Sequence, residues 1–281
     1  MTAQIIDGKK IANNLLEEIK QEIQDRVSKG GKQPCLAVIL IGNNPASHVY
    51  VKNKKLACEK VGIKSISYDF DISISETKLL NLIKEVNSNQ DIDGILIQSP
   101  LPDHIDEDKI INAINPKKDV DGFHPTNIGL LAIRQPNLRS CTPYGVIKML
   151  KASNIKLEGL DATIVGVSNN VGRPMALELL LEKCTVTSCH SKTKDLEGKV
   201  RQADLVVVAA GRQNLVKGEW IKNGAIVIDI GINRVNDKLV GDVEFEVASQ
   251  KAAFITPVPG GVGPMTVATL MENTLIAQKL R

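Results

Sequence analysis

The sequence has few aromatic residues, no cluster of like charge and no apolar run long enough to span a membrane. Phenylalanine, tryptophan and tyrosine make up 3% of the 281 residues, which leaves few stacking platforms for single-stranded nucleic acid. The 35 lysines and arginines are scattered among 32 acidic residues, for a net charge of +3. The N-terminus also lacks a signal-peptide core. We therefore expect no nucleic-acid partner, no membrane insertion and no secretion.

The cysteines provide neither a disulfide framework nor a metal cluster. They form an odd set without paired spacings: Cys35, Cys58, Cys141, Cys184 and Cys189. Such a set is typical of the reducing cytoplasm. Cys184 and Cys189 precede His190, but a zinc site needs further ligands, and no second ligand cluster exists. We expect buried thiols, a cytoplasmic protein and no metal.

Strand-like and helical segments alternate along two separate stretches of the chain. In the first stretch, strands are expected at 36–41, 64–70 and 94–98, and helices at 7–29, 47–61, 75–87 and 106–114. In the second stretch, strands are expected at 162–167, 185–189, 204–209 and 225–230, and helices at 174–182 and 196–202. Helical patterns at 127–133, 143–152 and 265–280 complete the reading. Alternation of this kind indicates parallel strands joined by helical crossovers.

The expected fold class is therefore α/β, with two α/β domains around a cleft. A chain of this length exceeds the usual size of one single-core domain. We place an N-terminal catalytic domain at 1–120, a linking segment at 121–140 and a second domain at 141–264. The last helix, 265–281, is expected to return to the first domain.

A glycine-containing loop follows the first strand of the second domain. The segment Gly166–Gly172, GVSNNVG, lies between an apolar strand and a helix with Pro174 in its first turn. Free backbone N–H groups at such a helix start can bind a phosphate. Ser168 replaces the second glycine of the usual dinucleotide fingerprint, so an ordinary tight turn is the alternative interpretation. With its neighbouring strands, the loop predicts a Rossmann-like dinucleotide-binding domain.

The end of the next strand indicates which dinucleotide is bound. An acidic residue at this point usually meets the free ribose hydroxyl of NAD, whereas this chain has His190-Ser191-Lys192-Thr193. Hydroxyls and a cation suit the 2′-phosphate of NADP. Two further strands end at Ala209-Ala210-Gly211 and Asp229-Ile230-Gly231-Ile232, at the edge where such sheets bind ligands. We expect NADP in preference to NAD.

Candidate reacting side chains lie in the first domain. Ser47, Tyr50 and Lys54 are spaced to share one helix face. A solvent-exposed pair is one interpretation of this spacing. In a buried pocket, a desolvated ammonium held by a phenol could instead exchange protons near neutrality. Short-chain dehydrogenases share the Tyr-x-x-x-Lys spacing, but there it follows the nucleotide loop, whereas here it precedes that loop.

Gln98 ends a strand, and Asp121 lies in a charged turn, so both side chains can reach a common site. Asp119 and Asp121 could be simple turn residues. A buried carboxylate could alternatively accept two parallel hydrogen bonds from adjacent N–H donors of an amino-heterocycle such as a pterin.

Seven motifs together resemble the bifunctional methylenetetrahydrofolate dehydrogenase/methenyltetrahydrofolate cyclohydrolase family. They are SHVYVKNKKLACEKVGI, GILIQSPLP, KDVDGFHPTNIG, CTPYGVIKML, GVSNNVGRPMA, CHSKT and PVPGGVGPMTVATLMENT. The resemblance implies NADP-dependent oxidation of methylenetetrahydrofolate and hydrolysis of the methenyl product. It also implies a homodimer joined through the cofactor domains.

The resemblance also assigns site residues. Catalytic and folate-binding roles fall on Tyr50, Lys54, Gln98 and Asp121, with Pro259, Gly260, Gly261 and Val262 beside the substrate. Cofactor binding falls on Gly166, Val167, Ser168, Ser191, Thr193 and Ile232. Val167 stands where many members carry arginine, so the NADP preference depends more on residues 191–193, and Ser99 stands where an aliphatic residue is more usual. Another NADP-linked dehydrogenase and a non-catalytic NADP-binding module are the alternative functions.

Overall fold

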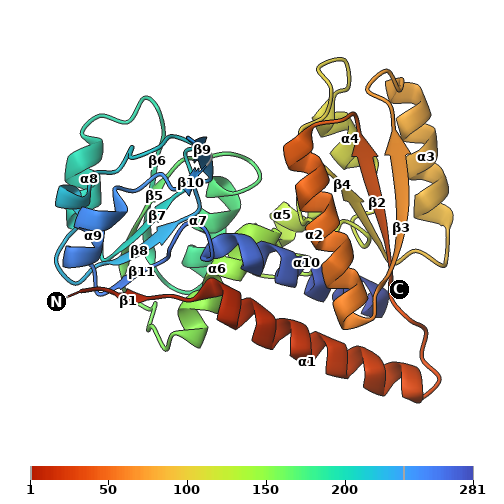
Figure 1. Ribbon diagram of the computed structural model, residues 1–281, viewed down its shortest axis with the longest axis horizontal. Coiled ribbons are helices and arrows are strands. Elements are labelled where there is room, and N and C mark those ends of the chain that lie inside the picture. Colours follow the sequence, from red (N-terminus) through yellow and green to blue (C-terminus); the bar gives the residue numbers. More distant parts are fainter. Residues whose placement is uncertain (1, 237, 281) are drawn as a thin grey trace. The chain divides into compact units, whose positions relative to one another are not determined.

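The apolar run Cys35–Ile41 forms β2 (Figure 1). All seven of its residues are buried in the computed structural model. The structure describes residues 2–236 and 238–280. β3 (Lys64–Phe70) and β4 (Gly94–Ile97) pair with β2 on either side, so the sheet order is β3-β2-β4 with all strands parallel. A central parallel strand is covered on both faces, which is why its sequence is continuously apolar.

Three helices belong with this sheet: α2 (Pro45–Val61), α3 (Glu76–Ser88) and α4 (Glu107–Ala113). α3 begins after Ser75, whose side chain accepts a hydrogen bond from the Lys78 backbone. α3 buries one apolar stripe, which consists of Leu79, Ile83 and Val86. Each of these side chains stabilises the fold by about 1.5–3 kcal/mol. This sheet and its helices form the core of a compact unit of residues 13–141 and 267–280.

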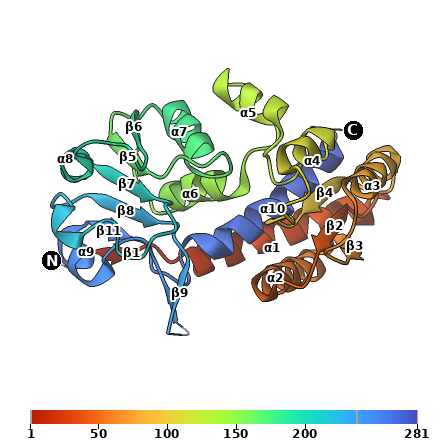
Figure 2. The same cartoon turned by 90° about the horizontal axis from the view of Figure 1, so that it is seen from above.

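A second compact unit contains residues 2–12 and 142–266. Its parallel sheet has the order β1 (Gln4–Ile5), β11 (Phe254–Ile255), β8 (Ile226–Asp229), β7 (Leu205–Val208), β5 (Asp161–Val165) and β6 (Thr185–Cys189). Figure 2 shows α7 (Gly172–Leu181) and α9 (Phe245–Lys251) beside this sheet, where they contact β5–β6 and β11 respectively. α6 (Cys141–Ala152), α8 (Leu196–Gln202) and a short 3₁₀ helix (Gly218–Trp220) complete the unit. The expected α/β fold class, with parallel sheets, is confirmed.

Some short elements were not anticipated. The first twelve residues are expected in the N-terminal domain, whereas β1 pairs in parallel with β11 and extends the second sheet. β9 (Asn233–Val235) and β10 (Lys238–Val240) form an antiparallel hairpin. Strands of two or three residues show no readable periodicity, which explains why the sequence did not reveal them.

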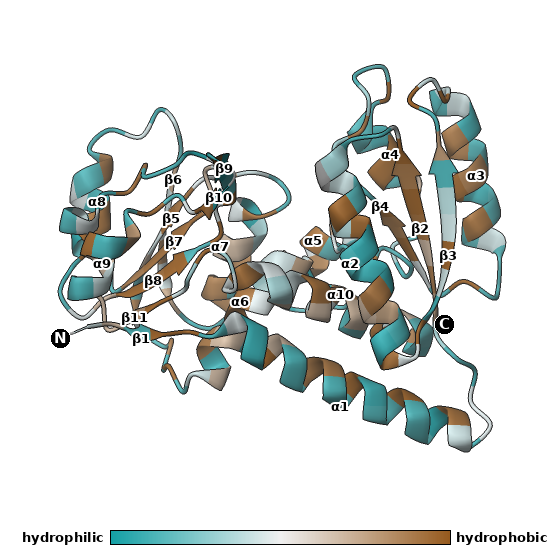
Figure 3. Cartoon of the chain, viewed as in Figure 1, coloured by the Kyte–Doolittle hydropathy of each residue, from teal (hydrophilic) through white to brown (hydrophobic). Residues whose placement is uncertain are grey.

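The remaining helices are α1 (Gly8–Ser28), α5 (Pro125–Ala132) and α10 (Val262–Lys279). Figure 3 shows apolar residues along β2 and β4, and polar and apolar residues alternating along α1 and α3. Within residues 2–236 and 238–280, no helix combines the length and the apolar character needed to cross a membrane.

Candidate active site

Lys54 and Gln98 contact each other directly. Lys54 lies on α2 and is half-buried, and its Nζ donates a hydrogen bond to Gln98 Oε1 at 3.1 Å. Gln98 follows β4, and its Nε2 donates to the backbone oxygen of Ser99 at 2.7 Å. An ammonium has donors only, so the carbonyl end of the glutamine must face Lys54. The contact therefore fixes both the amide orientation and the position of the ammonium.

The other two candidates on α2 differ in their surroundings. Tyr50 lies one turn before Lys54 and is 41% exposed, so its ring is accessible to a ligand. Ser47 is only 5% exposed, and its backbone N–H donates to Asn44 Oδ1 near the start of the helix. The three residues predicted to share one helix face thus differ in exposure: the serine is buried, the lysine is half-buried and the tyrosine is accessible.

Asp121 is held in a turn that Asp119 organises. The carboxylate of Asp119 is buried and accepts hydrogen bonds from the backbone N–H groups of Gly122, Phe123 and His124. It also accepts one from Asn127 Nδ2 at 2.8 Å. A carboxylate that bonds several donors fixes the backbone around it. Asp119 is therefore the turn residue of the pair.

Residues from α10 and from the segment before α6 fix the same turn from outside. Asn273 is fully buried, and its Nδ2 donates to the backbone oxygens of Val120 and Arg139, both at 2.8 Å. Ser140 Oγ donates to the Gly122 oxygen at 2.9 Å. The backbone on both sides of Asp121 is therefore held by buried side chains. The contacts of Asn273 span more than a hundred residues and the contact of Ser140 spans 18, and no sequence spacing indicates either role.

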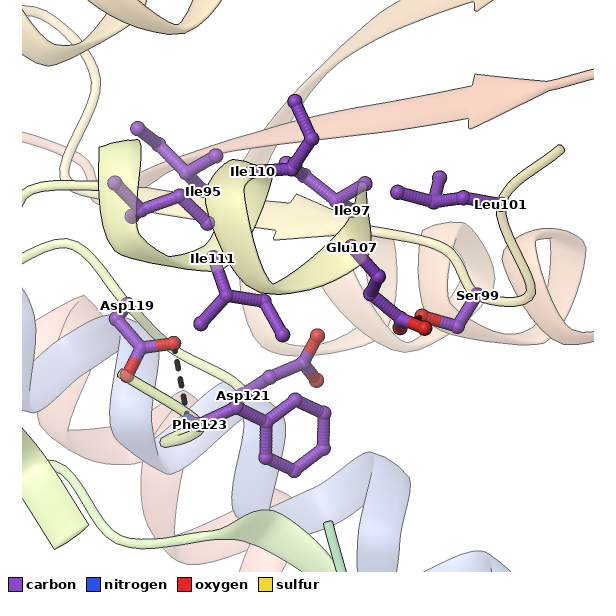
Figure 4. Close-up of a pocket in the computed structure, with 11 residues that line it drawn as sticks. Ile95, Ile97, Ser99, Leu101, Glu107, Ile110, Ile111, Asp119, Asp121 and Phe123 are labelled. Carbon is purple, nitrogen blue, oxygen red and sulfur yellow. Dashed lines mark hydrogen bonds between the residues drawn. The ribbon is translucent and has the colours of Figure 1, made fainter. Parts of the chain in front are cut away.

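Asp121 borders a small apolar cavity of about 20 Å³, enough for one water-sized sphere (Figure 4). The lining includes Ile95, Ile97, Ile110, Ile111 and Phe123. Burial raises the pKa of Asp121 to about 6, although the nearby Lys54 ammonium lowers it and Asp119 raises it further. The structure thus brings an ionisable carboxyl group into the electrostatic range of Lys54.

Ser99, noted in the sequence as a departure from the family pattern, contacts Glu107, a residue that sequence reasoning missed. Ser99 Oγ donates to Glu107 Oε1 at 2.5 Å, and Glu107 lies in the first turn of α4 (Figure 4). The hydroxyl follows Gln98 directly in the chain. Serine in place of the more usual aliphatic residue thus adds a hydrogen bond beside Gln98.

The predicted dinucleotide loop has the geometry of a phosphate cradle. Gly166 follows β5 with φ of +110°, and a Cβ atom there would lie 2.1 Å from the Ala209 oxygen. α7 starts at Gly172 after Val171, and no described side chain caps it. Ser168 Oγ accepts a hydrogen bond from the Val171 backbone at 3.2 Å. A close backbone approach and an uncapped helix start fit the phosphates of a dinucleotide.

The segment after β6 folds into a compact turn. Thr193 Oγ1 accepts a hydrogen bond from the His190 backbone at 2.8 Å, and the Thr193 N–H donates to the His190 oxygen at 2.8 Å. Ser191 and Lys192 are exposed within this turn. Val167 is half-buried after β5, and Ile232 is 46% exposed after β8. All six cofactor candidates thus follow the carboxyl ends of parallel strands in one unit.

The remaining candidates, Pro259 to Val262, join β11 to the start of α10. Gly260 accepts a hydrogen bond from the Lys9 backbone at 3.0 Å, which fixes this loop against the first turn of α1. Gly261 and Val262 are buried, whereas Pro259 is exposed. The loop lies in the unit that carries the cofactor candidates, while Tyr50, Lys54, Gln98 and Asp121 lie in the other unit.

Comparison with protein families assigns both parts of the chain. Residues 6–121 match the catalytic domain of the tetrahydrofolate dehydrogenase/cyclohydrolase family. Residues 140–281 match the NAD(P)-binding domain of the same family.

Similar proteins extend over the whole chain. The bifunctional protein FolD of Methylobacillus flagellatus is 64% identical over 281 residues, covering 100% of this chain and 97% of the relative. The bifunctional FolD of Campylobacter jejuni has a crystal structure with a TM-score of 0.97 and 52% identity, and the match covers 99% of both chains. The Trypanosoma brucei FolD, crystallised with NADP and an inhibitor, has a TM-score of 0.96 and 38% identity, covering 100% of this chain and 98% of that one. The chain therefore belongs to the tetrahydrofolate dehydrogenase/cyclohydrolase family.

Proposed function

We propose that this chain oxidises 5,10-methylenetetrahydrofolate with NADP and hydrolyses the resulting 5,10-methenyltetrahydrofolate to 10-formyltetrahydrofolate. The observation that supports this most directly is the hydrogen bond between Lys54 and Gln98 near the ionisable carboxyl group of Asp121. A positioned amine, an amide and a carboxylate suit a reaction in which charge appears and disappears at one carbon. NADP supplies the hydride acceptor when it is bound.

Lys54 manages protons in the hydrolytic step. Water adds to the methenyl carbon and loses a proton. N5 is then protonated, the carbon–N5 bond breaks, and the hydroxyl group loses its remaining proton as the formyl C=O forms. The net reaction consumes one water and releases one proton. Lys54 Nζ is held by Gln98 and can take the proton from the added water and return one to N5. Tyr50, one turn away and accessible, orients the lysine and packs against the folate.

Asp121 binds the pterin ring. An ionised carboxylate accepts two parallel hydrogen bonds from the adjacent N–H donors of the ring, and the fixed backbone around Asp121 limits the cost of ordering it. The Pro259–Val262 loop contributes to the substrate site. This assignment depends on the resemblance of the PVPGGVGP segment to the family motif.

NADP binding falls to the loops after β5, β6 and β8. Gly166, Val167 and Ser168 hold the pyrophosphate at the start of α7. Ser191 and Thr193, with Lys192, bind the 2′-phosphate, and Ile232 contacts the nicotinamide half. Because Val167 offers no charge to the 2′-phosphate, the preference for NADP over NAD depends on the 191–193 turn.

The test is product formation by the purified chain from methylenetetrahydrofolate, with NADP and NAD compared side by side. We expect methenyltetrahydrofolate with NADP, followed by hydrolysis faster than in buffer. Lys54→Met should abolish the hydrolysis, whereas Lys52→Met, an exposed neighbour on α2, should leave it unchanged. Full cyclohydrolase activity in Lys54→Met would contradict the assignment.

We also propose that the protein is a cytoplasmic homodimer joined through its cofactor domains. The unit of residues 2–12 and 142–266 exposes apolar side chains at Leu180, Leu239 and Val247. The five cysteines are free thiols, which suits a reducing compartment. Light scattering of the purified chain tests the assembly, and a monomer mass at micromolar concentration contradicts it.

A further inference from the structure

Asp242 is fully buried, and its carboxylate accepts hydrogen bonds from three consecutive backbone N–H groups. It follows β10, and its Oδ2 accepts hydrogen bonds from Ala210 N at 2.7 Å and Gly211 N at 2.8 Å. Its Oδ1 accepts from Arg212 N at 2.8 Å and from Asn233 Nδ2 at 2.8 Å. Three consecutive N–H groups around one anion form the arrangement that proteins otherwise use to bind phosphate. In this chain an internal side chain fills it.

Asp229, the last residue of β8, makes the complementary set of contacts. Its carboxylate accepts hydrogen bonds from the N–H groups of Gly231, Asp242 and Val243 at 2.9–3.0 Å. Asp229 is 4% exposed. The two aspartates therefore act in series: Asp242 fixes the 210–212 loop after β7, and Asp229 fixes the backbone of Asp242 itself.

Two glycines, Gly231 and Gly241, allow the carboxyl groups of Asp242 and Asp229 to approach the backbone. A Cβ atom on Gly231 would lie 2.2 Å from the carboxyl carbon of Asp242. A Cβ atom on Gly241 would lie 1.9 Å from Asp229 Oδ2. The residue two positions after one aspartate and the residue just before the other must both be glycine for the two carboxylates to approach the backbone.

Burying two neighbouring carboxylates carries an electrostatic cost, which a turn with a purely structural role could avoid. Burial raises the pKa of Asp229 to about 6, and the charge of Asp242 raises it further. Two buried carboxylates in one cluster repel each other, and their hydrogen bonds to backbone donors only partly offset this. Such clusters persist where they hold a site in a defined geometry.

We propose that Asp242, supported by Asp229, is a positioning residue for the dinucleotide: it fixes the 210–212 loop and the Gly231–Asn233 segment in the conformation that receives NADP. The inference rests on the proposed function, because it takes the carboxyl ends of β7 and β8 as the cofactor site. Asp242 acts through backbone groups and touches no reacting atom. It adds to the cofactor assignments at 166–168, 191, 193 and 232 a second set of residues behind the site.

Asp242→Asn tests the inference, because an amide cannot replace the carboxylate here. Each oxygen of Asp242 accepts two N–H donors, so either orientation of an asparagine points its NH₂ group at two donors. We expect the KM for NADP to rise about tenfold or more, with the KM for methylenetetrahydrofolate unchanged. Hydrolysis of methenyltetrahydrofolate needs no nucleotide, so it should stay within about twofold of the unsubstituted chain.

Two further variants keep the test decisive. Asn233→Ala removes one of the four donors and leaves the carboxylate intact, so it should raise the KM for NADP by a smaller factor, even where Asp242→Asn fails to fold. Asp161→Asn changes an exposed aspartate of the same unit and should leave every constant unchanged. NADP should raise the Tm least in Asp242→Asn, more in Asn233→Ala, and as much in Asp161→Asn as in the unsubstituted chain.

Two results would overturn the inference. One is an unchanged KM for NADP in both Asp242→Asn and Asn233→Ala. The other is an equal fall in dehydrogenase and cyclohydrolase activity in Asn233→Ala, which would indicate a general structural role. If the unsubstituted chain hydrolysed methenyltetrahydrofolate but gave no NADP-dependent oxidation, the proposed function would fail instead, so the two failures are distinguishable.

Discussion

Lys54 and Gln98 are separated by 44 positions in the chain, and a 3.1 Å hydrogen bond joins their side chains. Two further hydrogen bonds follow: Gln98 Nε2 donates to the backbone oxygen of Ser99, and Ser99 Oγ donates to Glu107 at the start of α4. The lysine is therefore attached, through one amide, to the loop that follows β4. Its position depends on this loop as much as on α2.

Gln98→Met should remove the hydrogen bond that joins Lys54 on α2 to the loop after β4. Methionine fills a similar volume but cannot accept the hydrogen bond from Lys54, so the ammonium loses its fixed position. We expect the kcat of the cyclohydrolase to fall about tenfold to a hundredfold. Stopped-flow hydrolysis of methenyltetrahydrofolate measures this. Gln90→Met, at an exposed site after α3, is the matched control, and an unchanged kcat in Gln98→Met would show that Lys54 needs no orientation by the amide.

Asp121→Asn should stabilise the protein at neutral pH. The folded-state pKa of about 6 lies above the ordinary value of 3.8, so the folded protein binds this proton more tightly than the unfolded chain does. The associated stability is present below pH 3.8 and is lost as the pH rises through 6. Asparagine avoids this loss, and we expect a gain of about 1–3 kcal/mol in the free energy of unfolding at pH 7.5. Urea denaturation at pH 7.5 and pH 4.5 should show the gain shrinking at the lower pH.

The same substitution should weaken folate binding. As the pH falls below about 6, Asp121 becomes protonated and loses its ability to accept two hydrogen bonds from the pterin, so the KM for folate should rise. In Asp121→Asn this pH dependence should disappear, and the KM should be high at every pH. The KM for NADP is the internal control. Equal losses for both ligands would argue against the pterin role.

Most of the regular structure could be predicted because its signals are local. The apolar run that became β2 and the amphipathic stripe of α3 follow directly from burial, and the predicted bounds of β3, β6 and α8 agree with the structure. The β9–β10 hairpin and the pairing of β1 with β11 were missed. Their strands are short, and their positions depend on neighbours that are distant in sequence.

Of the candidate site, the sequence indicates the candidate functional groups but not the residues that support them. Tyr50, Lys54, Gln98 and Asp121 are predicted from helical spacing, strand ends and the family motifs. The supporting residues act through hydrogen bonds that the sequence does not reveal: Asn273 donates to the backbone oxygens of Val120 and Arg139, and Glu107 accepts from Ser99. α10 carries several other polar residues, so its sequence pattern does not single out Asn273.

Asn273→Leu should destabilise the first unit and impair the folate site together. Leucine fits the volume, but the backbone oxygens of Val120 and Arg139 each lose the hydrogen bond that the amide provides. We expect a loss of about 2–4 kcal/mol in the free energy of unfolding, and a higher KM for folate because Val120 precedes Asp121. Gln278→Leu, on the same helix with one bond to the Lys32 oxygen, should cost less than about 1 kcal/mol. Similar losses in the two variants would refute the specific role of Asn273.

Gly166→Ala should impair the NADP-dependent oxidation without impairing the hydrolysis of methenyltetrahydrofolate. At φ of +110° an alanine is strained, and its Cβ would lie 2.1 Å from the Ala209 oxygen, so the loop after β5 must move. We expect NADP-dependent oxidation to fall by about a hundredfold or more through the KM for NADP, while methenyltetrahydrofolate hydrolysis without nucleotide persists.

Gly224→Ala separates the backbone strain from the steric overlap at Gly166. Gly224 also has a positive φ, +84°, but a Cβ atom there meets nothing within 4 Å. It should lower stability by about 1 kcal/mol and leave the KM for NADP unchanged, because it carries the strain without the overlap. Kinetics of both reactions on the two variants, alongside urea denaturation, decide the matter. If both variants changed the KM for NADP equally, the effect would come from strain in the unit as a whole, and the cradle at Gly166 would lose its special place in cofactor binding.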